Sequence, residues 1–148
     1  MSQTECLTCL SNTGERRISP GPTIHAGRYW FVEHAYPVQQ PGWLVLVLKR
    51  HAAALHELTS DEFAELGELL ERTVRVLHTV TGSAKEYASC FAEGEGFHHV
   101  HVHVFARPAE WPDALQGTRS FALLKDVVDH PELRADVRAL CVALRAAW

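Results

Sequence analysis

The chain has 148 residues, enough for one domain that buries roughly two-thirds of its unfolded surface. Its apolar fraction of 47%, charged fraction of 22% and net charge of −4 are those of an ordinary globular protein. These values exclude the broad basic surface of a protein that coats nucleic acid, so an anionic ligand must be met by a local site.

No run of 18 apolar residues predicts a membrane helix, and the first ten residues lack a basic segment followed by an apolar run. We therefore expect a cytoplasmic chain with reduced thiols and no membrane partner. In that compartment the Cys6-x-x-Cys9 pair indicates metal or redox chemistry before a disulfide. Cys90 and Cys141 are isolated and are expected to be small buried side chains.

The first half of the chain predicts an arm followed by two strands. Residues 10–27 are rich in Gly, Pro and Ser and predict an irregular arm. Residues 28–34 are aromatic and β-branched and predict a strand, and residues 36–42 predict a turn. Residues 43–51 predict a buried strand that ends in a basic pair and a histidine.

A long helix is expected next. Thr59 and Glu62 form a Thr-x-x-Glu capping box, and the helix is expected to end at Gly82. Apolar residues at three- and four-residue steps predict its buried stripe: Phe63, Leu66, Leu70, Val74, Leu77 and Val80.

Two further strands are expected over 86–93 and 97–106, and a final helix begins near Pro131, with Leu133, Val137, Leu140 and Leu144 on one face. Strands grouped around one long helix with short connections predict an α+β fold. The sheet is expected to be antiparallel, with about five strands.

The stretch 96–105, "GFHHVHVHVF", carries four histidines. Alternation along a strand places His99, His101 and His103 on one face, opposite the core-forming valines, and removes His98 from that face. Three histidines in line span about 13 Å, so they converge poorly on one metal ion. A neutral imidazole that attacks phosphorus is the other chemistry that fits, because neighbouring groups can fix its tautomer and stabilise phosphoryl charge.

The run from His99 to Phe105 resembles the His-φ-His-φ-His-φ-φ signature of the histidine triad (HIT) superfamily, where φ is apolar. Residues 40–70 also resemble the strand, basic-pair-histidine and long-helix segment of that family. The resemblance implies a HIT-like domain over 1–107 with a C-terminal helical extension over 108–148. It also implies a homodimer and nucleotidyl hydrolase or transferase chemistry on a nucleoside 5′-phosphoramidate or a dinucleoside polyphosphate.

By the same resemblance the catalytic residues are His101, His103 and His99. His101 is expected to capture the nucleotidyl group, His103 to contact the phosphoryl group, and His99 to orient the site. Some members of the family resemble this chain in a further set of residues, which are expected to bind structural zinc: Cys6, Cys9, His51 and His99. Such a Cys₂His₂ set suits a closed tetrahedral site that would fasten the arm to the sheet.

The chain departs from the family pattern at several substrate-facing positions. Trp43 stands where many members have histidine, and Ala35 where they have an acidic residue that contacts ribose, for which His34 or Glu33 is expected to compensate. The loop 91–98 lacks the usual Asn and Ser or Thr. It offers two carboxylates, and the backbone amides of Gly94 and Gly96 are expected to bind phosphate. The residues expected at the substrate are His34, Trp43, Gly94 and Gly96.

Three functions remain open on these residues. The first is a zinc-containing nucleotidyl hydrolase or transferase that uses His101. The second is a nucleotide-binding regulatory module with little turnover, which Trp43 and the altered loop favour. The third is a metal-binding strand that uses the triad itself.

Overall fold

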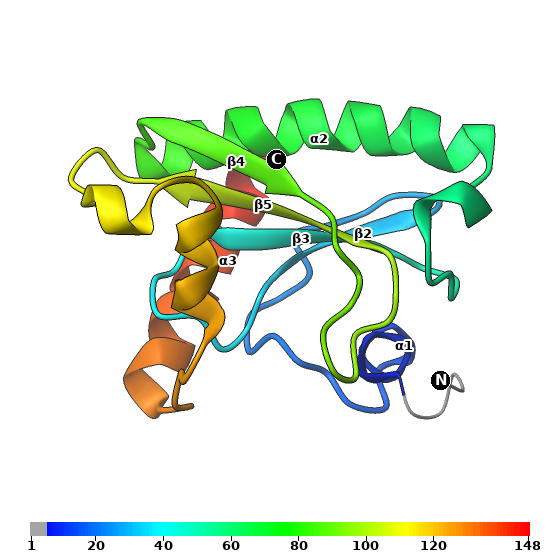
Figure 1. The fold of residues 1–148 in the computed structure, drawn as a ribbon, viewed down its shortest axis with the longest axis horizontal. Coiled ribbons are helices and arrows are strands. Elements are labelled where there is room, and N and C mark those ends of the chain that lie inside the picture. The colour runs from blue at the N-terminus through cyan, green and yellow to red at the C-terminus, as the bar shows by residue number, and fades with distance from the viewer. Residues whose placement is uncertain (1–5) are drawn as a thin grey trace.

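A five-stranded antiparallel sheet organises the computed structural model, which describes residues 6–148 (Figure 1). The strand order is β1-β2-β3-β5-β4, and every neighbouring pair is antiparallel. The strands are β1 (His25–Ala26), β2 (Trp30–His34), β3 (Trp43–Leu48), β4 (Lys85–Ser89) and β5 (His101–Arg107). The helices are α1 (Leu7–Thr13), α2 (Ser60–Thr81) and α3 (Pro131–Ala147), with short 3₁₀ helices η1 (Leu55–Glu57), η2 (Asp113–Leu115) and η3 (Gly117–Leu124). The expected α+β class is confirmed.

Helix α2 lies along one face of the sheet, whereas α1 lies on the opposite side (Figure 1). The main hydrophobic core sits between the sheet and α2, and α3 packs into the same core. Val102 and Val104 of β5 are buried in it, as the alternation of the strand predicts. The histidine-bearing face of β5 is turned away from this core.

The capping box at the start of α2 is present in both directions. The Glu62 amide donates to Thr59 Oγ1 at 3.2 Å, and the Thr59 amide donates to Glu62 Oε2 at 2.8 Å. Glu62 is buried, and its carboxylate also accepts from the Arg50 guanidinium at 2.6 and 2.8 Å. Because Glu62 takes the inward position of the first turn, the neighbouring Phe63 is turned outward and is 46% exposed. The expected stripe was wrong at Phe63.

The arm is more ordered than residues 10–27 alone predict. The chain forms α1 from Leu7 to Thr13, with the Cys6 thiol accepting from the Cys9 amide at its start and Gly14 at φ 81° at its end. Asn12 then ties the arm to the sheet, because its side-chain amide donates to the Leu48 and Lys49 carbonyls at 2.9 and 3.2 Å. A helix of seven residues is too short for apolar periodicity to reveal.

The segment after β5 covers both faces of the sheet in turn. Residues of η2 and η3, with Trp111 just before η2, form a second hydrophobic cluster on the face opposite α2, together with Trp43 and Phe105. Helix α3 then returns to the main core, where Cys141 is completely buried. Among residues 6–148, no helix is long and apolar enough to cross a membrane.

Candidate active site and metal cluster

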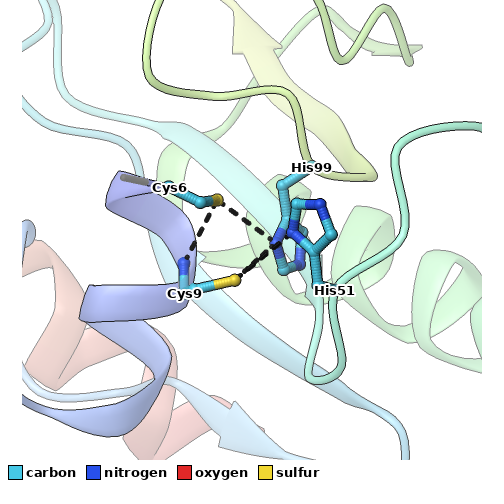
Figure 2. Close-up of side chains that lie close together, drawn as sticks. All are labelled: Cys6, Cys9, His51 and His99. Carbon is cyan, nitrogen blue, oxygen red and sulfur yellow. Dashed lines mark hydrogen bonds between the residues drawn. The ribbon is translucent and has the colours of Figure 1, made fainter. Parts of the chain in front are cut away.

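Four side chains from three distant segments of the chain converge beside the start of β5 (Figure 2). Helix α1 supplies Cys9 and is preceded by Cys6, the chain after β3 supplies His51, and the chain before β5 supplies His99. One ligand atom from each residue lies within 4.8 Å of the others. The spacing of the Cys-x-x-Cys pair places both thiols on the first turn of the helix, which directs them to one point.

The separations between thiols and ring nitrogens fit a tetrahedral metal site. Cys6 Sγ lies 3.6 Å from His99 Nδ1, and Cys9 Sγ lies 3.4 Å from His51 Nδ1 and 3.5 Å from His99 Nδ1. Metal–sulfur and metal–nitrogen bonds of zinc length at a tetrahedral angle would separate S and N by about 3.6 Å. The donor set therefore suits a closed Cys₂His₂ site.

Each ring nitrogen of His99 has a distinct use. Nδ1 faces the two thiols, while Nε2 donates to the Leu48 carbonyl at 2.7 Å. Such a carbonyl partner fixes the tautomer that leaves Nδ1 free as a ligand. His99 is completely buried, and burial lowers its pKa to about 4, so the imidazole is neutral near pH 7.

His101 and His103 are the first two residues on the cavity-facing side of β5 and lie side by side, with ring centroids 4.8 Å apart. His101 Nδ1 donates to the main-chain carbonyl of His99 at 2.7 Å, so the lone pair of this ring is on Nε2. His103 Nδ1 accepts from the indole N–H of Trp43 at 2.9 Å, so the proton of this ring is on Nε2.

Both rings are held in the neutral form. Burial lowers the pKa of His101 below its ordinary value, and the Nδ1–H bond to the His99 carbonyl offsets part of that change. Burial, and then repulsion from the protonated form of His101, lowers the pKa of His103 to about 3. A neutral imidazole retains the lone pair that a nucleophile needs.

A cavity of about 510 Å³ opens in front of these two rings. Its floor is formed by the histidine-bearing face of β5 and the adjoining face of β3. Its walls come from the arm, from η3 and from the loop that precedes β5. The wall side chains include Thr8, Ser11, Asn12, Ile18, Phe91, Glu93, Phe97, Phe121 and Leu124. Glu33 and Glu93 are acidic, and within residues 6–148 no lysine or arginine lines the cavity.

Comparison with known proteins agrees with this geometry. The HIT domain family matches residues 26–110, more than half of the chain. The chain belongs to the HIT family. No curated protein sequence matches it.

Solved structures share the HIT fold with this chain at low sequence identity. A Hit-like protein involved in cell-cycle regulation from Bartonella henselae is 12% identical, with a TM-score of 0.76 over 100% of this chain and 98% of its own. A histidine triad protein from Sinorhizobium meliloti is 21% identical, with a TM-score of 0.69 over 87% and 90%. A Zn-bound histidine triad family protein from Mycobacterium smegmatis is 17% identical, with a TM-score of 0.65 over 99% and 100%.

In this HIT domain the triad histidines occupy different positions. Strand β5 begins at His101, later than the expected start at residue 97. Just before the strand, the Val100 amide donates to the carbonyl of Ala52, which lies beyond the end of β3. His99 therefore precedes the strand and points to the metal cluster, while His101 and His103 face the cavity. His98 is exposed, in agreement with its exclusion from the working face.

The residues expected at the substrate divide into two groups. His34 and Gly94 line the cavity, but the His34 ring is buried and closes the 35–42 turn. Trp43 is only 2% exposed and does not line the cavity; it contacts His103 from behind. Gly96 is also outside the lining, and its carbonyl accepts from the Leu7 amide at 2.9 Å. Trp43 and Gly96 therefore pack behind the site and do not face the cavity.

Glu33 does face the cavity from β2, two residues before Ala35, where the resemblance implies a ribose contact. Its carboxylate is bonded to the Arg17 guanidinium at 2.9 and 3.2 Å and to the Thr23 hydroxyl at 2.6 Å. These contacts fix the carboxylate and neutralise much of its charge. Ala35 also lines the cavity and offers no polar side chain.

Sequence reasoning missed the walls contributed by η3 and by the arm. Phe121 and Leu124 come from the C-terminal segment, and Thr8, Ser11 and Asn12 from α1. An apolar pair three residues apart in 117–124 is the only local signal for η3. The proximity of either segment to the histidines depends on tertiary packing alone.

Proposed function

We propose that this HIT protein is a nucleotidyl hydrolase or transferase that uses His101 as its nucleophile. The observation that carries the proposal is the 2.7 Å bond from His101 Nδ1 to the His99 carbonyl. That bond leaves the Nε2 lone pair on the cavity side of a neutral ring that is positioned before substrate arrives.

The proposed reaction has two displacements at phosphorus. His101 Nε2 attacks the α-phosphorus of the nucleotide, an N–P bond forms, and the bond to the leaving amine breaks as the amine takes up a proton from solvent. Water then attacks the same phosphorus, the N–P bond breaks, and a nucleoside monophosphate and a proton leave. If another acceptor takes the place of water, the product is a transferred nucleotidyl group.

The other triad residues support this reaction in different ways. His103 presents Nε2–H toward the cavity and would donate to a phosphoryl oxygen, whose negative charge grows in the transition state. His99 is a positioning residue, because it reaches the nucleophile through its main-chain carbonyl.

We propose zinc as the metal of the Cys₂His₂ cluster, held by Cys6, Cys9, His51 and His99. With four protein ligands the ion would have no open position, so its role would be structural. It would hold α1 against the sheet and fix the ring and backbone of His99. The thiol–nitrogen separations of 3.4–3.6 Å support this assignment.

The charges of the cavity favour a phosphoramidate over a dinucleoside polyphosphate. Its lining contains two acidic side chains and no cationic one within the described residues. A polyphosphate chain would bring several negative charges into a cavity that is lined by the Glu93 carboxylate, and like charges repel. A phosphoramidate carries one negative charge and an amine leaving group, which the acidic and aromatic walls accommodate.

The test is a mass measurement after mixing the purified protein with a nucleoside 5′-phosphoramidate. The expected result is a nucleotidyl adduct on His101 and release of the nucleoside monophosphate. His101→Ala should abolish both, and His98→Ala is the matched control, because His98 is an exposed histidine three residues away. An active His101→Ala protein, or a wild type that releases no product from a broad panel of nucleotides, would contradict the proposal.

A second candidate is a nucleotide-binding regulatory module with little turnover. The absence of hydroxyl side chains over 91–98 favours it, since fewer donors hold the phosphoryl oxygens. Equal nucleotide affinity in wild type and His101→Ala, without any product, would select this candidate.

We also propose a homodimer. Strand β4 is the last strand of the sheet order, so its outer edge is available to pair with a second chain. Phe63 of α2 is also exposed, and a second chain would cover this apolar side chain. Light scattering should give twice the mass of one chain at micromolar concentration, and a monomer mass would contradict the proposal.

A further inference from the structure

Trp43 is buried behind His103, at the position where many members of the family carry histidine. Its indole Nε1–H donates to His103 Nδ1 at 2.9 Å, and the two rings meet edge-on at an interplanar angle of 86°. An indole nitrogen can only donate, never accept. The nitrogen that it meets must therefore carry a lone pair, and the proton of the neutral His103 ring must lie on Nε2.

The Trp43 ring is itself held rigidly. It stacks on Phe105 with centroids 3.6 Å apart and an interplanar angle of 6°, and Phe121 packs against it edge-on at 5.1 Å. Trp43 and Phe105 are each 2% exposed, and they are partners across β3 and β5. The direction of the indole N–H is thus determined by packing before any ligand enters the cavity.

The two cavity histidines consequently have opposite proton assignments. A main-chain acceptor keeps the His101 proton on Nδ1, and the Trp43 donor keeps the His103 proton on Nε2. One ring presents a lone pair to the cavity and its neighbour presents an N–H. Within the described residues, His103 Nε2 has no hydrogen-bond partner, so its proton is available to a ligand.

We propose that Trp43 is a positioning residue that fixes His103 as an Nε2–H donor to a phosphoryl oxygen of the substrate. The inference rests on the proposed nucleotidyl chemistry. A large apolar residue at position 43 would not perform this role. The indole N–H, and not the area of the ring, determines which nitrogen of His103 carries the proton.

The test compares two tryptophan-to-phenylalanine variants. Trp43→Phe retains an aromatic ring to stack on Phe105 but removes the donor to His103. Trp30→Phe is the matched control: Trp30 is also fully buried and donates its indole N–H to the Glu62 carbonyl at 2.9 Å, on the core side of the sheet. Both variants lose one buried hydrogen bond, but only the first loses a bond to a cavity histidine.

Turnover of a nucleoside phosphoramidate is the first readout. We expect kcat of Trp43→Phe to fall about 10-fold, the loss of one well-placed hydrogen bond, with a smaller change in KM. The kcat of Trp30→Phe should remain within about 2-fold of wild type. Equal kcat in Trp43→Phe and wild type, or equal losses in both variants, would overturn the inference.

Nitrogen-15 NMR is the second readout, and it does not depend on activity. The wild type should show a scalar coupling across the hydrogen bond between Trp43 Nε1 and His103 Nδ1, with a His103 Nε2–H tautomer. His103→Gln assigns the signals, and Trp43→Phe should lose the coupling and shift the Nδ1 resonance. Absence of the coupling in an active wild type would overturn the inference, whereas the coupling in a protein without turnover would show that the proposed function has failed and the positioning role with it.

Discussion

The main-chain carbonyl of His99 accepts the Nδ1–H of His101 at 2.7 Å, while the His99 ring faces the thiols of Cys6 and Cys9. One residue thus belongs to the metal cluster through its side chain and to the nucleophile through its backbone. A change at the metal cluster that shifts the His99 backbone would move the carbonyl that determines the His101 tautomer. The metal cluster and the cavity are therefore mechanically coupled over two residues.

Removal of a thiol ligand should release the metal and loosen the arm. We expect the wild-type protein to bind about one zinc per chain and Cys9→Ser to lose it, because three remaining ligands hold the ion less tightly. Thermal unfolding should shift downward in the same variant, and chelation of the wild type should reproduce the shift. Elemental analysis and calorimetry are the measurements.

Cys90→Ser is the control for that experiment, since Cys90 lies outside the cluster and is half-buried. It should retain the metal. Equal zinc content in Cys9→Ser and wild type would contradict the assignment and would indicate that the cavity histidines bind the metal.

The ion pair between Arg50 and Glu62 at the start of α2 should stabilise the protein at neutral pH but not at strongly acidic pH. Bonds from Arg50 lower the pKa of Glu62 to about 2, from an ordinary value of 4.5. A depressed carboxyl pKa stabilises the folded state above about pH 4.5, and this contribution is lost as the pH falls toward 2. Because the Arg50 side chain is 45% exposed, solvent screens part of the attraction, and Glu62→Gln should lower the free energy of unfolding by about 2 kcal/mol at pH 7.

Urea unfolding at pH 7 and pH 3 measures this effect, and the difference between Glu62→Gln and wild type should shrink at the lower pH. The matched control is Glu71→Gln, which breaks an exposed ion pair with Arg75 on the same helix. Its effect should stay below about 0.5 kcal/mol. A pH-independent loss in Glu62→Gln would show that packing, not charge, is responsible.

Much of this fold was predictable because the signals are local. The Thr59–Glu62 capping box, the alternation of Val102 and Val104, and Pro131 at the start of the last helix each report the backbone within a few residues. The position of Phe63 was not predictable in the same way. The buried Glu62 carboxylate accepts hydrogen bonds from Arg50, which lies twelve residues earlier. The spacing of apolar residues alone does not predict that a carboxylate points into the core.

In the candidate site, too, some features were predictable from the sequence and others depend on tertiary packing. The likeness to a known motif predicted the cluster residues, and the structure brings Cys6, Cys9, His51 and His99 together. The contact of Trp43 with His103 joins residues sixty positions apart through the register of β3 and β5, which no local pattern encodes. The cavity wall from η3 depends in turn on how the chain returns after β5.

His34 should make the stability of the protein depend on pH between about 4 and 6.5. Its Nδ1 donates to the Ala35 carbonyl at 2.6 Å and its Nε2 accepts from the Gly42 amide at 2.9 Å, so the neutral ring bridges the 35–42 turn. Burial lowers its pKa to about 4. Below pH 6.5 the unfolded chain binds the proton more readily, so stability falls as the pH falls toward 4.

In His34→Gln the part of this dependence that His34 contributes should be absent, whereas the buried His99 and His103 still contribute theirs. We expect the stability advantage of wild type over His34→Gln to be smaller by about 2 kcal/mol at pH 5 than at pH 7. Chemical unfolding at the two pH values gives the difference, and His56→Gln, an exposed substitution, should leave the wild-type dependence in place. A constant advantage of wild type over His34→Gln would mean that His34 is not neutral in the folded protein.

Phe121 should connect the C-terminal segment to substrate binding. Its ring lies edge-on to His103 at 5.1 Å and to Phe91 at 5.3 Å, and it lines the cavity. Phe121→Ala would remove an apolar wall next to the proposed phosphate contact and admit water to it. We expect KM for a nucleoside phosphoramidate to rise about 10-fold, since burying an aromatic contact contributes on the order of 1–2 kcal/mol.

The control is Val128→Ala, because Val128 is 74% exposed on the same C-terminal segment and outside the cavity lining. Metal content should equal that of wild type in both variants, which separates a change in the cavity from a change in the Cys₂His₂ cluster. If Phe121→Ala binds and turns over the nucleotide as wild type does, η3 supports the sheet without contacting substrate. A raised KM with the metal retained would instead make the segment after β5 part of the binding site.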